Sequence, residues 1–171
     1  FMQETGVFAA VFGFASNNTA LRRLEEIAGA FDRPVQALPK LASFFTAKEK
    51  ALAFARRLRF SGEKMNSLGA LFDCAQAILP SLPVAAQKRL IRRYGGEAFA
   101  EASMLAWAKG EGLIEAKSPY RSMLALACEW KAPEFMVSGS DLKALGFAEG
   151  KALGEQLRAL EEAWENSDYT L

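Results

Sequence analysis

Apolar residues recur at intervals of three and four along most of the chain, and short polar or proline-containing stretches separate the segments that carry them. Leu21, Leu24 and Ile27 share one side of a helix for which Asn17 or Asn18 supplies the N-cap. Further helices are predicted at residues 38–45, 47–59, 61–79, 83–94, 95–107, 118–132, 139–145 and 150–166. Val, Ile and Thr are scarce beside Ala, Leu, Glu, Lys and Arg, so the sequence predicts an all-α fold.

Residues that favour helix starts mark several boundaries. Thr46 with Glu49, and Ser138 with Asp141, have the spacing of a capping box, in which a hydroxyl and a carboxylate satisfy free N–H groups. Ser61 is placed to cap the helix that follows it. We therefore expect helices to begin at these three places.

The order of these segments predicts two parts. Residues 1–131 form an irregular multi-helix body, and residues 132–171 form a helical, hairpin-like tail packed on that body. The last helix is expected to bury one stripe, formed by Leu153, Leu157, Leu160 and Trp164.

Three glycines in the tail fall at an even step of four. Gly146 is expected to end the short helix in the left-handed conformation that glycine adopts without strain. Gly150 and Gly154 lie at the start of the last helix, where free N–H groups and Lys151 favour an anion. A phosphate contact is one explanation for Gly154, and close packing against the short helix is the other.

Charge is distributed unevenly although the net charge is only +1. Residues 33–93 contain twelve Lys or Arg and three Asp or Glu, whereas residues 141–171 contain three and seven. Arg56, Arg57 and Arg59 fall outside the core stripe of helix 47–59. The basic face of helix 84–94 contains no acid, so we expect this face to be unpaired and a polyanion to bind the middle of the chain. Ordinary solvated faces are the alternative. The candidate RNA-binding residues are Arg56, Arg57, Arg59, Lys64, Lys88, Arg89, Arg92, Arg93, Gly150, Lys151 and Gly154.

Residues that would support catalysis are missing from the sequence. There is no histidine, no phosphate-binding loop and no nucleophile elbow, and the four aspartates are too dispersed to hold paired magnesium ions. We expect no catalytic residue, no metal ligand and no cofactor in this chain. Cys74 and Cys128 are expected to be buried free thiols, and the longest apolar run, GVFAAVFGFA, is too short to cross a membrane. These features favour a cytoplasmic protein.

The stretch from Trp130 to Leu171 shares twelve positions with a known family, namely Ser138, Gly139, Asp141, Leu142, Leu145, Gly146, Gly150, Gly154, Leu157, Leu160, Glu161 and Trp164. It resembles the C-terminal end of bacterial class II CCA-adding enzymes, the tRNA nucleotidyltransferase and poly(A) polymerase family. The stretches ETGVFAAVF, LEEIAGAF and ARRLRFSGEKMNSL agree with the same family in the same order. The resemblance therefore covers essentially the whole chain.

The resemblance implies a function that the residues alone do not define. In this family a magnesium-dependent catalytic head and a nucleotide-selecting neck come first, so both would lie upstream of Phe1 on the same polypeptide. This chain would then be the non-catalytic body and tail, which hold tRNA by backbone and shape contacts while the head adds CCA to its 3′ end. A helical protein-interaction or structural module that stabilises the enzyme or a dimer is the competing hypothesis.

Overall fold

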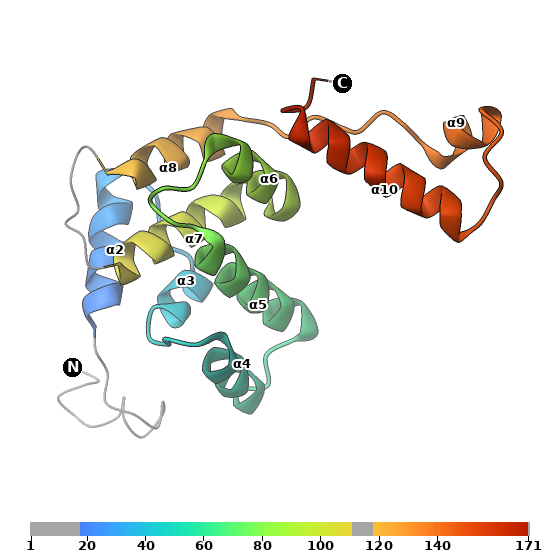
Figure 1. Cartoon of the computed structure of the whole chain (residues 1–171). Helices are drawn as coiled ribbons and strands as arrows, with labels where there is room; N and C mark the ends of the chain where they lie inside the picture. Colours follow the sequence, from blue (N-terminus) through green and yellow to red (C-terminus); the bar gives the residue numbers. More distant parts are fainter. Residues whose placement is uncertain (1–17, 111–117, 171) are drawn as a thin grey trace.

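The computed structural model of the chain describes residues 18–110 and 118–170, and all regular structure in these ranges is helical (Figure 1). The helices are α2 (Thr19–Ala30), α3 (Ala37–Ala42), α4 (Lys48–Arg57), α5 (Gly62–Ala77), α6 (Val84–Tyr94), α7 (Gly96–Lys109), α8 (Pro119–Glu129), α9 (Gly139–Ala144) and α10 (Lys151–Asn166). This confirms the all-α prediction. The N-terminal segment ETGVFAAVF lies outside the described residues.

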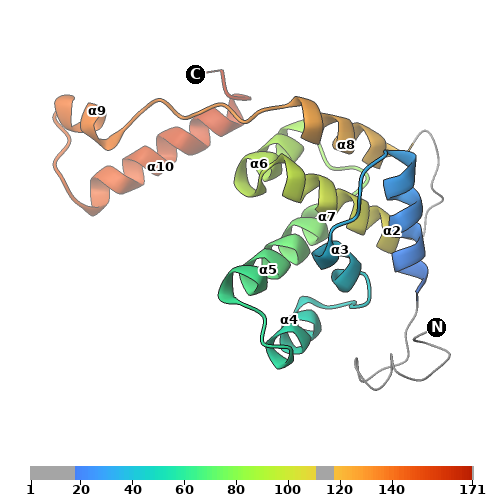
Figure 2. The same ribbon diagram turned by 180° about the vertical axis from the view of Figure 1, so that it is seen from behind.

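Helix α7 lies at the centre of the body and contacts α2, α3, α5, α6 and α8 (Figures 1 and 2). Phe99, Met104 and Leu105 are at most 2% exposed, and small side chains between them let neighbouring helices come close. The Trp107 ring stacks on Tyr120 of α8 with 5.6 Å between centroids and meets the edge of Phe31 at 6.3 Å. Aromatic packing thus joins α7 to α8 and to the end of α2.

Most helix ends lie within two residues of their predicted positions. The Ser61 hydroxyl accepts a hydrogen bond from the Lys64 N–H, and Ser138 with Asp141 forms the predicted capping box. The other predicted capping box, Thr46 with Glu49, is absent because α4 begins one residue later, at Lys48, and takes Ala47 as its N-cap.

The tail consists of α9, which lies beside α10, and the connecting turn around Gly146. Gly146 has φ +95°, and the N–H groups of Gly146 and Phe147 donate to the carbonyls of Lys143 and Leu142. This is the left-handed helix end that the sequence predicted. The tail projects from the body and meets it at the C-terminal end of α10, close to α6 (Figures 1 and 2).

The predicted buried stripe of α10 is only partly buried. Trp164 is 6% exposed, but Leu160 is 41% exposed and Leu153 and Leu157 are half-buried. The reason is that α9, only six residues long, is the main helix packed against this face. Packing in the tail is therefore concentrated around Trp164.

The two cysteines differ in environment, contrary to the expectation that both are buried. Cys74 is buried in the core, where desolvation raises the pKa of its thiol to about 12, whereas Cys128 is exposed near the end of α8. Both are free thiols. Within the described ranges, no helix has the length and apolar character needed to span a membrane.

Gly96 lies directly against the backbone of α8, and Gly96→Ala should destabilise the body. A Cβ atom at this position would lie 2.5 Å from the backbone carbonyl oxygen of Ala127 in α8. We expect a loss of about 1–3 kcal/mol in the free energy of unfolding, measured by urea titration with circular dichroism. The matched control is Gly29→Ala in α2, where nothing lies within 4 Å and the change should stabilise the protein by up to about 1 kcal/mol. If both substitutions changed the free energy of unfolding equally, the close contact between Gly96 and α8 would not be important for stability.

Candidate nucleic-acid interface

The basic face of α6 is covered by side chains from the end of the tail. The Lys88 Nζ donates to both carboxylate oxygens of Asp168 at 2.7 and 2.8 Å, and Arg89 Nη1 donates to the Asn166 amide oxygen at 3.0 Å. These residues are close neighbours in space although they lie 80 and 77 positions apart in the chain.

Arg92 lies in the middle of this contact and is paired twice. One of its terminal nitrogens donates to Glu161 and the other to Glu165. The expectation of an unpaired face on α6 is therefore wrong for Lys88 and Arg92, because acids absent from the helix itself come from α10. Glu161 and Glu165 are therefore engaged with the body and are not simply solvated.

An aromatic cluster lies directly beside these ion pairs. The ring of Trp164 is 5.1 Å from Phe135 and 5.0 Å from Tyr169, and the Tyr169 ring is 5.2 Å from Trp130. The cations of the α6 face also contact the cluster, since Lys88 Nζ is 5.8 Å from the Trp130 ring and the Arg92 guanidinium is 5.1 Å from that of Trp164. We call the set Lys88, Arg89, Arg92, Trp130, Phe135, Glu161, Trp164, Glu165, Asn166, Asp168 and Tyr169 the tail anchor.

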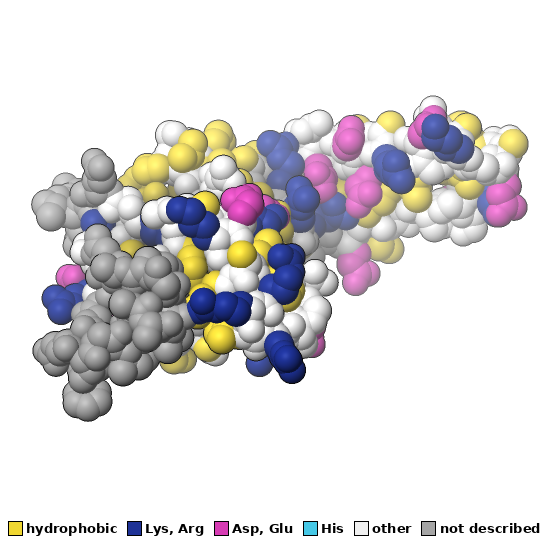
Figure 3. All heavy atoms as spheres, turned by 90° about the horizontal axis from the view of Figure 1, so that it is seen from below, with side chains coloured by type: hydrophobic (Ala, Val, Ile, Leu, Met, Phe, Trp, Pro, Cys, Tyr) yellow, Lys and Arg dark blue, Asp and Glu magenta, His cyan; other side chains and the backbone are white. Residues whose placement is uncertain are grey.

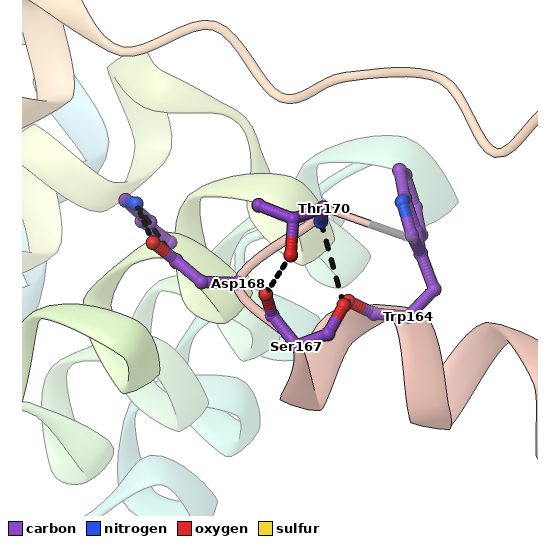
Figure 4. Close-up of polar contacts among 5 residues, drawn as sticks. Trp164, Ser167, Asp168 and Thr170 are labelled. Carbon is purple, nitrogen blue, oxygen red and sulfur yellow. Dashed lines mark hydrogen bonds and ion pairs between the residues drawn. The ribbon is translucent and has the colours of Figure 1, made fainter.

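A tight turn after α10 brings the last residues of the anchor into place (Figure 4). Asp168 and Tyr169 both have positive φ, +58° and +68°, and the Tyr169 N–H donates to the Trp164 carbonyl at 3.0 Å. The Ser167 hydroxyl donates to the same carbonyl at 2.9 Å, and the Thr170 hydroxyl donates to the Ser167 carbonyl at 2.6 Å. Because a positive φ is costly for these residue types, the contacts that they make must stabilise the turn.

Partial burial strengthens the charged contacts of the anchor. The Lys88 and Arg92 side chains are 18% and 22% exposed. The hydrogen bond that Arg92 donates to Glu161 is the main cause that raises the pKa of Arg92 above its ordinary value. Desolvation opposes this effect, and the hydrogen bond to Glu165 adds to it, so the guanidinium stays charged. Pairs of this kind contribute up to about 1 kcal/mol each at a surface, and an aromatic pair contributes about 0.5–1.5 kcal/mol beyond its buried area.

A groove of about 600 Å³ runs beside the anchor between α6 and α10. Its walls include Arg89, Arg93 and Arg158 as well as Arg92 with its two glutamates. Arg93 and Arg158 are exposed, and neither is ion-paired within the described ranges. Arg158 was not among the sequence candidates, and only the packing of α10 beside α6 brings it to this groove.

The second basic cluster lies at the junction of α4 and α5, at the end of the body seen from below in Figure 3. Arg56, Arg57, Arg59 and Lys64 are all exposed. Arg57 lies over the Phe54 ring at 5.2 Å, and among described residues Arg56, Arg59 and Lys64 have no carboxylate partner. Figure 3 shows Lys and Arg prevailing over Asp and Glu on this part of the body, whereas both signs mix along the tail.

Arg59 adopts a backbone conformation that is unusual for its residue type. Its φ is +56°, and it follows α4 at the position where glycine commonly ends a helix. The N–H groups of Arg59 and Phe60 donate to the carbonyls of Arg56 and Ala55 at 3.0 Å each. An arginine at this position places a cation at the edge of the cluster, although its left-handed backbone conformation is strained.

The start of α10, the third candidate region, lies at the opposite end of that helix from the anchor (Figure 1). Gly150 has φ +147°, and Lys151 is almost fully exposed with its Nζ 3.6 Å from Glu155. A Cβ atom at Gly154 would meet nothing within 4 Å, so close packing against α9 does not explain this glycine. A phosphate contact at this helix start stays a prediction.

Acidic side chains show no arrangement typical of a metal site. In the described ranges, no group of three His, Cys, Asp or Glu side chains is close enough to hold an ion. Asp141 and Asp168 have structural roles instead, since one caps α9 and the other binds Lys88. What the site offers chemically is therefore guanidinium and ammonium donors for an anion.

Comparison with known proteins relates part of the chain to CCA-adding enzymes. A segment of 42 residues is 43% identical to the mitochondrial CCA tRNA nucleotidyltransferase 1 of Danio rerio. Segments of 43 residues are 40% identical to the proteins of that name from Mus musculus and Homo sapiens. Each match covers 25% of this chain and 10% of the relative. No family model matches the chain.

The anchor should decide whether the tail stays on the body, and Trp164→Ala tests this. Loss of the central ring should lower the free energy for opening α9 and α10 by about 3 kcal/mol, while α7 keeps its protection. Amide hydrogen exchange measured for each helix reports both values. Leu160→Ala is the control, because that side chain is 41% exposed and its loss should matter little. Equal loss of protection in α7 would mean that body and tail unfold as one unit.

Proposed function

We propose that this chain is the tRNA-binding body and tail of a CCA-adding RNA nucleotidyltransferase of the bacterial class II type. The observation that carries the proposal is the exposed cationic cluster at the α4–α5 junction, in a chain related over part of its length to CCA-adding enzymes. Arg56, Arg59 and Lys64 meet no carboxylate among the described residues, so their charge is available to a polyanion.

Contacts to phosphate fit this cluster better than contacts to bases. Arginine presents a planar fork of N–H donors that matches phosphate oxygens, and lysine adds a point charge. Backbone contacts of this kind provide affinity and register without reading sequence, which suits a protein that must accept every tRNA.

In this proposal the chain binds and positions RNA, and the reaction takes place elsewhere on the same polypeptide. Nucleotide transfer by two metal ions needs clustered carboxylates, and the aspartates of this chain do not form such a cluster. The catalytic head would therefore supply the magnesium site, and α4 to α6 would hold the tRNA so that its 3′ end reaches the head.

A protein-interaction or structural module remains the second candidate, and the tail favours it. Met136 and Leu145 are 84% and 77% exposed, and Phe147 is 43% exposed. Exposed large apolar side chains on a projecting segment are compatible with a contact to another protein surface. Association through these residues would depend little on salt, whereas RNA binding depends on it strongly.

Removing the α4–α5 charges should flatten the salt dependence of tRNA binding. The variant Arg56→Gln, Arg59→Gln and Lys64→Gln should reduce the slope of log affinity against log salt by roughly 2, since each phosphate contact contributes about 0.7–0.9. Fluorescence anisotropy of labelled tRNA at several salt concentrations measures the slope.

The matched control removes three charges elsewhere, by Arg22→Gln, Lys131→Gln and Lys143→Gln, and should change the slope less. Equal slopes for the two variants would assign the affinity to net charge rather than to this cluster. If the affinity of the parent protein for tRNA did not change with salt concentration, the protein-interaction module would be favoured.

Arg59 allows stability and binding to be separated. Arg59→Gly should raise the free energy of unfolding by about 0.5–1 kcal/mol, because glycine adopts the φ of +56° without strain, and should weaken tRNA binding. Arg59→Ala should weaken binding equally without the gain in stability. Chemical denaturation and the anisotropy assay measure the two effects. Full binding by both variants would remove Arg59 from the interface.

A further inference from the structure

Three carboxylates of the tail lie where an RNA phosphate backbone would have to bind α6. Glu161 and Glu165 are hydrogen-bonded to Arg92, and Asp168 to Lys88. A carboxylate and a phosphate offer the same paired oxygen acceptors to these donors. A phosphate that took these N–H donors would have to displace the carboxylates, so the tail and a phosphate compete for Lys88 and Arg92.

Few contacts outside the anchor hold the tail on α6. Its contact with the body is concentrated at the anchor, whereas α9 and the start of α10 project away from the body (Figures 1 and 2). Residues 131–137 connect α8 to α9 without helical structure and are mostly exposed. Such a connector can change direction while α9 and α10 keep their mutual packing.

The groove next to the anchor provides a place where an incoming phosphate can first bind. Arg93 and Arg158 are exposed there without a carboxylate partner in the described ranges, and Arg89 is held only by the neutral amide of Asn166. Cations at the rim of a charged contact raise the local concentration of an anion. A polyanion can thus engage the rim before the ion pairs of the anchor separate.

We propose that the acidic end of α10 is a built-in competitor of RNA, which occupies Lys88 and Arg92 until RNA phosphates displace it and release the tail. That the displacing polyanion is RNA rests on the proposed function. The displacement itself rests on the ion pairs, the connector and the rim arginines. In this view Lys88 and Arg92 add little to RNA affinity while the tail is docked, because carboxylates already neutralise them.

The first experiment measures the position of the tail directly in the otherwise unchanged chain. Nitroxide labels are placed on the exposed Cys128 and on the exposed position 156 after Gln156→Cys, while the buried Cys74 stays unlabelled. The distance between the labels should be narrowly distributed without RNA. Saturating tRNA should shift or broaden the distribution, as expected for a released tail.

The second experiment removes the competing charges and keeps their size. The variant Glu161→Gln, Glu165→Gln and Asp168→Asn should bind tRNA on the order of tenfold more tightly and steepen the salt slope by roughly 2, because Lys88 and Arg92 become available. Glu134→Gln, Glu149→Gln and Glu155→Gln form the matched control. They change the net charge of the tail equally, but among the described residues none of these glutamates forms an ion pair with α6.

The outcomes separate this inference from the proposed function. If the parent binds tRNA but the label distance is unchanged and the two variants bind alike, the competition is refuted and the proposed function stands. If neither the parent nor the anchor variant binds tRNA, both fail. If only the anchor variant binds, both are supported, and hydrogen exchange in α7 confirms that the body of the variant is intact.

Discussion

Helix α7 is buried on most of its circumference, and the other helices of the body pack on it directly or, as α4 does, through α5. Small residues make this possible. Gly96 lets the α8 backbone approach, and the fully buried Ser103 satisfies its hydroxyl within the helix by donating to the Phe99 carbonyl at 2.7 Å. The positions of both basic regions follow, because α6 packs on α7 and the α4–α5 junction is held at the outer end of α5.

Most of the helices could be predicted from the sequence because their signals are local. Ser61, the Ser138–Asp141 pair and Gly146 each act within four residues, so their effect can be read without knowing the fold. The Thr46–Glu49 pair had the same spacing, yet the α4 start uses Ala47 instead. A capping motif shows that a helix could begin at that residue. Whether it does begin there depends on the backbone path that leads into the helix.

The contact between α10 and α6 could not be predicted in the same way, because it joins residues more than sixty positions apart. Helical periodicity placed Lys88, Arg89 and Arg92 on one face but could not say what meets that face. A usable signal was present in the charge distribution, since a basic middle and an acidic end of one chain attract each other. From the sequence we expected either an external polyanion or ordinary solvated faces. The structure adds an internal partner.

The three tryptophans lie in two different environments, the core and the tail anchor, so tryptophan fluorescence can report on each of them. Trp107 stacks on Tyr120 in the core, whereas Trp130 and Trp164 lie in the tail anchor beside cations. An indole that becomes exposed to water emits at longer wavelength. Release of the tail would shift the emission of Trp130 and Trp164 alone, whereas unfolding of the body would also shift that of Trp107. Phenylalanine in place of Trp107 would leave a spectrum that follows the tail alone.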